Sequence, residues 1–488
     1  MPLSLQNRRL KRIPVGRAVK NNVLFSIVLF AGVLLRVVTV LGYPPALWFN
    51  DSYDYVRLGN SPFPNPLRSE GYGIMLWLLR PFHSLAFVVT LQHLMIVAVA
   101  VLGYRVLVRD FAVRRGWAAL AVAPLLLDGF QIELEHMLLS DALFTALLLV
   151  AVLLMVRPGS SSLRRAGMVG GLLGVAAVTR TVGVPIIVIA VLFLLFRRTK
   201  WTAVAVLAVA FAVPVGGYAV WFQQEHGRLA LTGADGIFLW GRTTTFVDCS
   251  KKLPPGDLMY MCPAGRPGTR GAASHQIWVE GSPTGWRDGY AFSPEMNDRA
   301  QRFALWAIAQ QPGDYVQAVA YDFFIRTFSW DRTGHPTPAT AAKYRFPKRP
   351  DRQKDLPVIG GGDRSSVVRE YEHGSAATRI VEPFAGFMRG YQTYVNVRGT
   401  LLGIVLLFAS AGIVLRQARP ESAVFWLVGV ALLTVPPVTT DFDYRYVLPA
   451  MPFLFLSAAT AWNRDRGGTA DGSEAPRSTE RKPEPVRV

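Results

Sequence analysis

A short segment near the N-terminus places two carboxylates among aromatic side chains. It reads Trp48-Phe-Asn-Asp-Ser-Tyr-Asp-Tyr-Val-Arg57 and carries Asp51 and Asp54, three positions apart. Residues three apart in a helix lie on one face, so both acids would face the same space. A carboxylate there can accept the proton of an attacking hydroxyl group, which makes Asp51 a candidate general base. The alternative for either acid is a solvated loop residue or a helix cap.

The residues after this segment are candidates for binding a polar substrate. Tyr53, Tyr55 and Leu58 make the stretch amphipathic, as expected for a helix lying at a membrane interface. The chain then passes through three prolines into a segment that reads Arg68-Ser-Glu-Gly-Tyr72. The candidate substrate-binding residues of this region are Tyr55, Arg68, Glu70 and Tyr72.

Two arginines are candidates for binding a phosphate group. Arg180 interrupts apolar sequence, where a charged side chain usually faces a cavity or a partner. Arg445 follows Asp441 and Asp443 closely. A guanidinium group at either position could stabilise the negative charge that develops on a leaving phosphate. The alternatives are an outer turn marked by Arg180 and a weak surface ion pair at Arg445.

A second polar stretch, from Asp128 to His136, contains acids and no Lys or Arg. Its Glu133, Glu135 and His136 are candidates for binding the hydroxyl groups of a sugar. They could also help to hold a divalent cation, although such a cation needs several oxygen ligands. The sequence specifies no metal site and leaves a divalent cofactor open. The plain alternative is that all three are ordinary polar loop residues.

The long polar segment that begins near residue 223 contains both cysteines, Cys249 and Cys262. If this segment lies outside the cytoplasm, its surroundings are oxidising, so we expect the two cysteines to form a disulfide. The alternative is two unpaired thiols. Four tryptophans of this segment could stack on sugar rings or pack in a core. They are Trp240, Trp278, Trp286 and Trp330.

The elements that must position these residues are membrane helices. Of the 488 residues, 51% are hydrophobic and only 17% are charged, whereas a soluble domain has about 25% charged residues. The net charge is +19, but the basic residues form short clusters between apolar runs, which argues against nucleic-acid binding. Ten apolar runs are candidate spans: 23–41, 86–107, 117–127, 138–156, 166–178, 182–196, 203–221, 401–415, 423–438 and 446–461.

Basic clusters fall in alternate loops, and this alternation predicts the topology. Both termini are expected in the cytoplasm, and the large polar loop on the other side. The predicted regions are a basic N-terminus (1–21), a seven-helix module (22–222) with an acidic first outer loop (43–71), an extracytoplasmic loop domain (223–397), three C-terminal helices (398–462) and a disordered tail (463–488).

Several short motifs, taken in order, resemble those of the GT-C glycosyltransferases. This superfamily includes protein O-mannosyltransferases, the lipid A aminoarabinose transferase and the mycobacterial arabinofuranosyltransferases. Residues 50–55 look like its Asp-Glu-x-x-Tyr element, and residues 68–72 are similar to its Arg-Pro-Pro-Gly-Tyr element. Residues 135–141, 176–180 and 445–449 resemble elements of later helices. Ser52 replaces the usual second acid, and Ser69 with Glu70 replaces the proline pair.

The resemblance implies a fold and an activity. The fold is an all-α polytopic membrane protein, a GT-C-type bundle of about ten transmembrane helices with a mixed extracytoplasmic loop domain. The activity is a glycosyltransferase of the bacterial plasma membrane that acts in building the cell envelope. It moves a sugar from a polyprenyl-phosphate donor to a hydroxyl group of a glycan, lipid or protein. Asp51 and Asp54 would be catalytic, and Arg180 and Arg445 would bind the donor phosphate.

Other functions compete with this one. A transporter or flippase of lipid-linked glycans would also place ionisable residues among its helices, although it would more often show internal repeats. A polysaccharide polymerase or ligase of the other GT-C topology would put its main arginines in the large loop, where Arg242, Arg326 and Arg332 are available. A non-catalytic membrane scaffold is the third alternative.

Overall fold

The computed structural model describes residues 22–159, 162–285, 292–331, 338–350, 355–416 and 418–463. Within these ranges the regular structure is helical, and the two β-bridges, Leu47 with Met137 and Pro357 with Asp363, are isolated. The predicted basic N-terminus (1–21), nearly all of the predicted tail (464–488), Trp286 and Arg332 lie outside the described residues.

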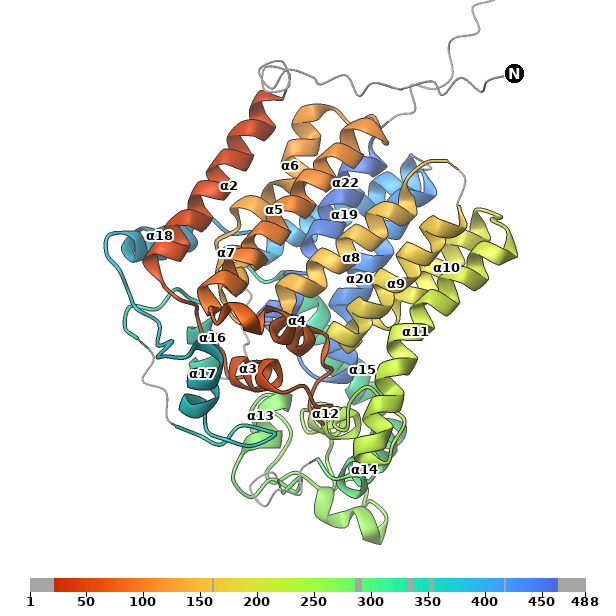
Figure 1. Ribbon diagram of the computed structural model, residues 1–488. Coiled ribbons are helices and arrows are strands. Elements are labelled where there is room, and N and C mark those ends of the chain that lie inside the picture. The colour runs from red at the N-terminus through yellow and green to blue at the C-terminus, as the bar shows by residue number, and fades with distance from the viewer. Residues whose placement is uncertain are drawn as a thin grey trace, which may run out of the picture.

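Most of the long helices run side by side and form a bundle (Figure 1). Its members are α2 (Val23–Gly42), α5 (Leu85–Arg109), α6 (Arg115–Leu127), α8 (Asp141–Val156), α9 (Leu163–Thr179), α10 (Ile186–Phe196), α11 (Trp201–His226), α19 (Gly399–Leu415), α20 (Pro420–Thr439) and α22 (Met451–Ala461).

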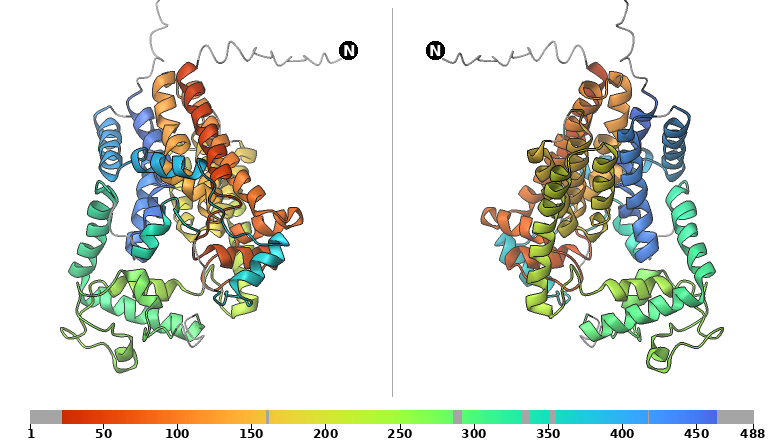
Figure 2. Two further views of the ribbon diagram at one scale, coloured as in Figure 1. Left: turned by 90° about the vertical axis from the view of Figure 1, so that its left-hand side faces the viewer. Right: turned by 90° about the vertical axis from the view of Figure 1, so that its right-hand side faces the viewer.

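Shorter helices gather mainly toward one end of this bundle, and α12 and α14 extend beyond it (Figure 2). The shorter helices are α3 (Ser52–Asn60), α4 (Gly71–Leu79), η1 (Arg80–Phe82), α7 (Gly129–His136), η2 (Thr181–Gly183), α12 (Asp235–Thr243), η3 (Gly256–Met261), α13 (Ala273–Trp278), α14 (Pro294–Gln310), α15 (Pro312–Ala320), the π-helical η5 (Tyr321–Arg326), α16 (Pro338–Lys343), α17 (Arg364–Glu372), α18 (Phe384–Tyr394) and α21 (Tyr444–Val447).

Four of the described helices, α2, α5, α11 and α20, are long and apolar enough to cross a membrane. Two bent pairs, α6 with α7 and α18 with α19, raise the number to six if each pair is one span. The helix α8 and the η2–α10 segment are shorter and apolar. These helices confirm the predicted class, an all-α polytopic membrane protein, while the count of ten spans stays a prediction.

Local sequence explains where the bundle helices break. Asp128 ends α6 and caps α7, because its carboxylate accepts hydrogen bonds from the amides of Phe130 and Gln131, each at 2.9 Å. The pair bends there by 47°. At the end of α9, Arg180 adopts an extended conformation and the chain turns into η2. Both breaks lie at the end of the bundle that carries α3 and α4 (Figure 1).

Three apolar clusters hold the described chain together, and the smallest contains Val178, Tyr218 and Phe222. The largest cluster fills the bundle and reaches α3, α4 and α17. The second cluster belongs to the loop segment, where Trp240, Phe303 and Ile277 pack between α12, α13 and α14. Buried aromatic and aliphatic side chains of this kind contribute about 1.5–3 kcal/mol each, so the loop segment has its own source of stability.

Candidate active site

The candidate residues converge at the end of the bundle next to α3. Asp51 directly precedes α3, and Asp141 is the first residue of α8. Arg180 ends α9, and Arg445 belongs to the short helix α21. Three of these helices, α3, α8 and α9, therefore present their ends to one region (Figure 1).

Asp51 is the centre of an ion-pair cluster. Its carboxylate lies 2.7 Å from the guanidinium of Arg68 and 2.9 Å from that of Arg445. It makes no capping hydrogen bond to α3, so the helix-cap interpretation does not describe this structure. Burial acts to raise the pKa of Asp51, but the two guanidinium groups outweigh it and hold the pKa well below its usual range. The side chain keeps 17% exposure, so an ionised carboxylate reaches the surface of the site.

Asp54 shares the cation of Asp51. Its carboxylate accepts a 3.0 Å hydrogen bond from the second terminal nitrogen of Arg68. Burial raises the pKa of Asp54, against the lowering effect of Arg68, and the negative charge of Asp51 raises it further. The two acids thus face one arginine, and Asp51 is the more strongly ionised of the two.

The neighbouring tyrosines fix the position of Arg68. Its guanidinium lies over the ring of Tyr55, 5.4 Å from the centroid, in cation–π geometry. Tyr55 packs edge-on against Tyr72 and shares a 3.0 Å hydrogen bond with Ser140. The hydroxyl of Tyr72 donates to Gln92 at 2.6 Å. Tyr55 therefore packs directly against Arg68, and Tyr72 holds Tyr55 in place.

Glu70 is close to the cluster but fully buried. One carboxylate oxygen accepts a 3.1 Å hydrogen bond from the amide of Asn65, and the other has no hydrogen-bond partner. Burial raises the pKa of Glu70 to about 9, so this acid is protonated at neutral pH. Its placement favours a structural role over contact with a substrate.

A second ion pair lies beside the first. Arg180 pairs with Asp141, and its guanidinium is 5.3 Å from the centroid of Tyr446. The other oxygen of Asp141 and the Nε atom of Arg445 are buried without hydrogen-bond partners. Asp443 accepts a 3.4 Å hydrogen bond from the amide of Arg445, which fixes the start of α21. Oppositely charged groups thus lie next to one another in this region, and some of their buried polar atoms make no hydrogen bond.

Glu135 and His136, predicted to bind substrate, are fully buried and make different contacts. Arg36 clamps the carboxylate of Glu135 with two hydrogen bonds of 2.8 and 2.7 Å. His93 contacts Glu135 at 2.8 Å and His136 at 3.1 Å. The other ring nitrogen of His136 lies 3.0 Å from the carbonyl of Tyr43. These contacts join α2, α5 and α7, so the geometry gives both residues a structural role.

Arg36 and His93 were not predicted as functional or structural residues. A sequence signal existed for Arg36, because an arginine inside a transmembrane segment needs a buried partner. Its partner, Glu135, is 99 positions away, and the sequence offers no indication of that pairing.

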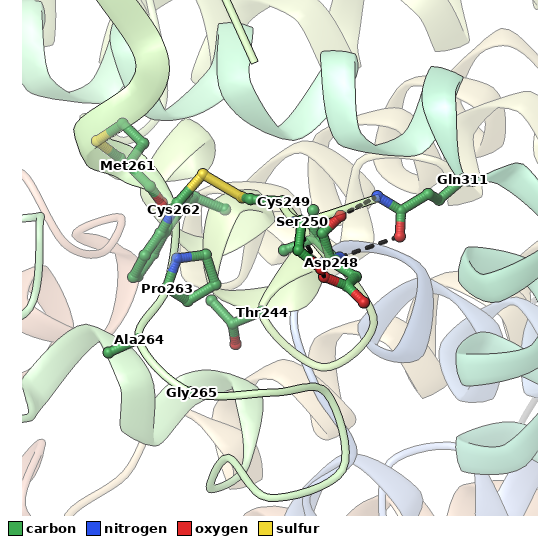
Figure 3. The surroundings of a disulfide bond; sticks show 12 residues. Thr244, Asp248, Cys249, Ser250, Met261, Cys262, Pro263, Ala264, Gly265 and Gln311 are labelled. Carbon is green, nitrogen blue, oxygen red and sulfur yellow. Dashed lines mark hydrogen bonds between the residues drawn. A yellow bond between two sulfur atoms is a disulfide. The ribbon is translucent and has the colours of Figure 1, made fainter. Parts of the chain in front are cut away.

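Cys249 and Cys262 form a disulfide in the structure (Figure 3). It links the turn after α12 to the end of η3. Close by, Gln311 accepts a 3.0 Å hydrogen bond from the amide of Asp248. The disulfide therefore belongs to the packing of the loop segment.

Two arginines of the large loop, Arg242 and Arg326, are paired with acids. Arg242 is 1% exposed and lies 2.5 Å from Asp322. Arg326 contacts Asp322 at 3.1 Å and Asp441 at 3.4 Å. The described tryptophans differ among themselves: Trp240 is buried and donates to the carbonyl of Met261, whereas Trp330 is 61% exposed. Over the described residues, no group of three or more His, Cys, Asp or Glu side chains is arranged to hold a metal ion.

Comparisons with known proteins add little to this geometry. No protein-family model matches the chain, and no curated protein matches it. Among solved structures, the chain is similar to the crystal structure of ArnT from Cupriavidus metallidurans bound to undecaprenyl phosphate. The sequence identity is 14%, the match covers 92% of this chain and 77% of that one, and the TM-score is 0.29. A similarity at this level assigns neither a fold family nor an activity to this chain.

Proposed function

We propose that the protein is a membrane glycosyltransferase that moves a sugar from a polyprenyl-phosphate donor to an acceptor hydroxyl group. The observation that carries the proposal is the partly exposed, ionised Asp51, held by two arginines at one end of an apolar bundle. The resemblance of residues 50–55 and 68–72 to glycosyltransferase motifs supports the same assignment.

The proposed reaction needs a base and a stabilised leaving group. The acceptor oxygen bonds to the anomeric carbon while its proton passes to Asp51. The bond from that carbon to the phosphate oxygen breaks, and its electron pair leaves with the polyprenyl phosphate. Arginines near that oxygen stabilise its charge as it develops. Arg445 and Arg180 have this role in the proposal, and the buried Nε atom of Arg445 without a hydrogen-bond partner offers a donor for it.

The pairing of Asp51 with arginine also predicts how the base is regulated. While Arg445 holds Asp51, the low pKa makes this carboxylate a weak base. The donor phosphate is a diester with one negative charge, and its oxygens would compete with the carboxylate of Asp51 for the same guanidinium. Release of Arg445 toward the phosphate would raise the pKa of Asp51 and make it a better base once the donor is bound.

The arrangement of charges supports an extracytoplasmic site. Arginines cluster in and beside the loops between α5 and α6, α8 and α9, α10 and α11, and α19 and α20. They lie at the end of the bundle opposite α3 and α4 (Figure 1). Basic loops favour the cytoplasmic side, so the proposal puts the Asp51 cluster on the other side of the bacterial plasma membrane.

The test is a transfer assay with purified protein and a panel of polyprenyl-phosphate sugars. Asp51→Asn keeps the shape of the side chain but cannot take the proton, so transfer should fall at least about a hundredfold. Donor binding should be largely kept. Asp54→Asn should cost less, since Asp54 contacts Arg68 and not Arg445 in the ion pairs described.

The outcomes separate the alternatives. A near wild-type rate for Asp51→Asn with an inactive Asp54→Asn would reverse the two roles. Full activity in both variants would contradict the mechanism. Movement of an intact lipid-linked glycan across vesicles, with no transfer to any acceptor, would support the transporter instead.

A further inference from the structure

A large cavity lies beside the candidate active site and takes no part in the chemistry described above. Its volume is about 1370 Å³, enough for several sugar residues. Its lining includes residues 47, 48 and 53 around the start of α3 and Glu133 of α7. The rest comes mainly from described residues of the segments 342–350, 355–369 and 374–378.

The described lining carries five cationic side chains against two acidic ones. The cationic residues are Lys343, Arg345, Arg349, Arg364 and Arg369. One of the acids, Asp355, accepts two hydrogen bonds from Ser365, at 3.1 and 2.9 Å. The cavity therefore has an excess of positive charge, which favours an anionic ligand.

The second acid, Glu133, has a carboxylate oxygen that accepts no hydrogen bond. Its side chain is 1% exposed, one oxygen accepts a 2.5 Å hydrogen bond from Gln392, and the other has no hydrogen-bond partner. A buried polar atom without a partner is costly. A hydroxyl group of a ligand in the cavity could donate to this oxygen. Hydroxyls and anionic groups occur together in acidic glycans.

Residues that line the cavity contact or lie next in sequence to members of the Asp51 cluster. Tyr53 lines it from α3, under the guanidinium of Arg364, 4.6 Å from the ring centroid. The charge of Arg364 also acts on Asp54. Lys343 donates a 2.5 Å hydrogen bond to Asn50, the residue before Asp51. A chain in the cavity could therefore extend its end to the proposed base.

The walls are fixed to one another. Trp48 donates a 3.1 Å hydrogen bond to the carbonyl of Ala376, and Thr378 donates to the carbonyl of Ala46 at 2.6 Å. Gln392 joins Glu133 to the carbonyl of Tyr344. A site whose walls are already joined loses little entropy when a ligand binds.

We infer that this cavity binds the acceptor, and that the acceptor is a glycan bearing carboxylate or phosphate groups. The inference rests on the proposed function, because it assigns the acceptor of that reaction. Its first part, preferential binding of an anionic glycan, is measured without any transfer.

The test measures binding of two probes of equal length to the full-length protein in detergent. Tetragalacturonate is the anionic probe, and maltotetraose is the neutral one. At low salt the anionic probe should bind at least about tenfold more tightly. Its affinity should fall as salt rises, because screening weakens contacts between exposed charges. Inorganic phosphate should compete with it.

Variants locate the binding. Arg345→Ala with Arg349→Ala removes two exposed cations of the cavity and should weaken tetragalacturonate at least about tenfold, with maltotetraose unchanged. The matched control is Arg266→Ala with Arg302→Ala, which removes two exposed cations of the loop segment outside the cavity lining. The control should bind both probes as the wild type does.

Three results would overturn the inference. One is equal affinity for the two probes. The second is equal loss of affinity in the cavity variant and the control. The third is complete competition by nanodiscs of phosphatidylglycerol but not of phosphatidylcholine, which would assign the cations to lipid headgroups. The anionic probe could bind as expected while no polyprenyl-phosphate sugar supports transfer. That result would contradict the proposed glycosyltransferase activity but not the anion-binding cavity.

Discussion

Arg180 and Asp141 are paired at the ends of two neighbouring helices, so a substitution at either residue affects both folding and binding. We expect Arg180→Ala to bind a polyprenyl-phosphate sugar at least about tenfold more weakly, since it loses a charged contact to the phosphate. Arg180→Lys should keep part of the affinity, because lysine keeps the charge but loses the two-pronged geometry. Donor affinity of purified protein is the measurement.

Two controls separate donor binding from folding at this position. Arg180→Ala leaves Asp141 unpaired, and Asp141→Asn in the same chain removes that buried charge. The double variant should regain thermal stability and still bind donor weakly. Arg157→Ala, at the opposite end of α8, breaks the exposed pair with Asp110 and should leave donor binding unchanged. Wild-type donor affinity in a folded Arg180→Ala protein would contradict the assignment.

Glu70 gives the candidate site a pH-dependent stability. In the unfolded chain its pKa is near 4.5, and in the folded protein burial raises it to about 9. Between these values the unfolded chain releases a proton that the folded protein keeps, so stability falls as the pH rises. Glu70→Gln removes this contribution. The variant should gain thermal stability relative to wild type as the pH rises from 5 to about 9, with no such trend below about 4.5.

Unfolding of both proteins in the same detergent, followed over this pH range, measures the difference. The other titrating groups are the same in both proteins, so their contributions to the difference in stability largely cancel. A pH-independent difference would mean that Glu70 is ionised in the folded protein.

At the residue scale, the sequence predicted the members of the Asp51 cluster better than their pairing. Asp51 and Arg68 are 17 positions apart in one segment, and both were selected by residue type and motif. Arg445 was selected too, as a phosphate-binding residue close to Asp441 and Asp443, with a surface ion pair as the alternative. In the structure it forms an ion pair with Asp51. Local spacing cannot predict a contact between positions 394 apart.

At the scale of helices, the contact between α4 and α9 positions both Glu70 and Arg180. Gly71 begins α4, and a Cβ atom there would lie 2.4 Å from the hydroxyl of Thr179 and 2.7 Å from its Cα atom. Gly71→Ala must push the two helices apart, at a cost of about 1–3 kcal/mol for overpacking. Both thermal stability and donor binding should fall, because Thr179 directly precedes Arg180.

Gly116, in the first turn of α6, is the control for this substitution. A Cβ atom there would meet nothing within 4 Å, and alanine favours a helix over glycine by about 1 kcal/mol. Gly116→Ala should therefore keep or raise stability and leave donor binding unchanged. Equal effects of the two substitutions would show that the α4–α9 contact does not position the site.

Apolar periodicity predicted the helices more successfully than their ends. The predicted segments 86–107 and 203–221 lie within α5 and α11. The segment 117–127 corresponds to α6, but the 47° bend at Asp128 was not predicted from the apolar pattern. The stretch around Asp54 was predicted as an amphipathic helix, and α3 is one, although it packs between α4 and α17. Coverage by α17, more than 300 residues later, depends on tertiary packing.

At the scale of the molecule, the distribution of charged residues distinguishes the two ends of the helix bundle. The basic loops gather at one end, and the acidic and mixed clusters around Asp51 gather at the other (Figure 1). Regular alternation along the chain predicted this separation. The size and lining of the cavity beside α3 were not predictable, because its walls come from segments up to about 330 positions apart.

The topology itself is the last prediction. If basic loops lie in the cytoplasm, residue 252 of the large loop lies outside and residue 116 inside. The two native cysteines are joined in a disulfide, so a single introduced cysteine can be labelled selectively. Lys252→Cys and Gly116→Cys both replace exposed residues. In right-side-out vesicles a membrane-impermeant maleimide should label Lys252→Cys and spare Gly116→Cys, and in inverted vesicles the pattern should reverse. Labelling of Lys252→Cys from the cytoplasmic side alone would place the Asp51 cluster in the cytoplasm, away from the acceptors proposed for it.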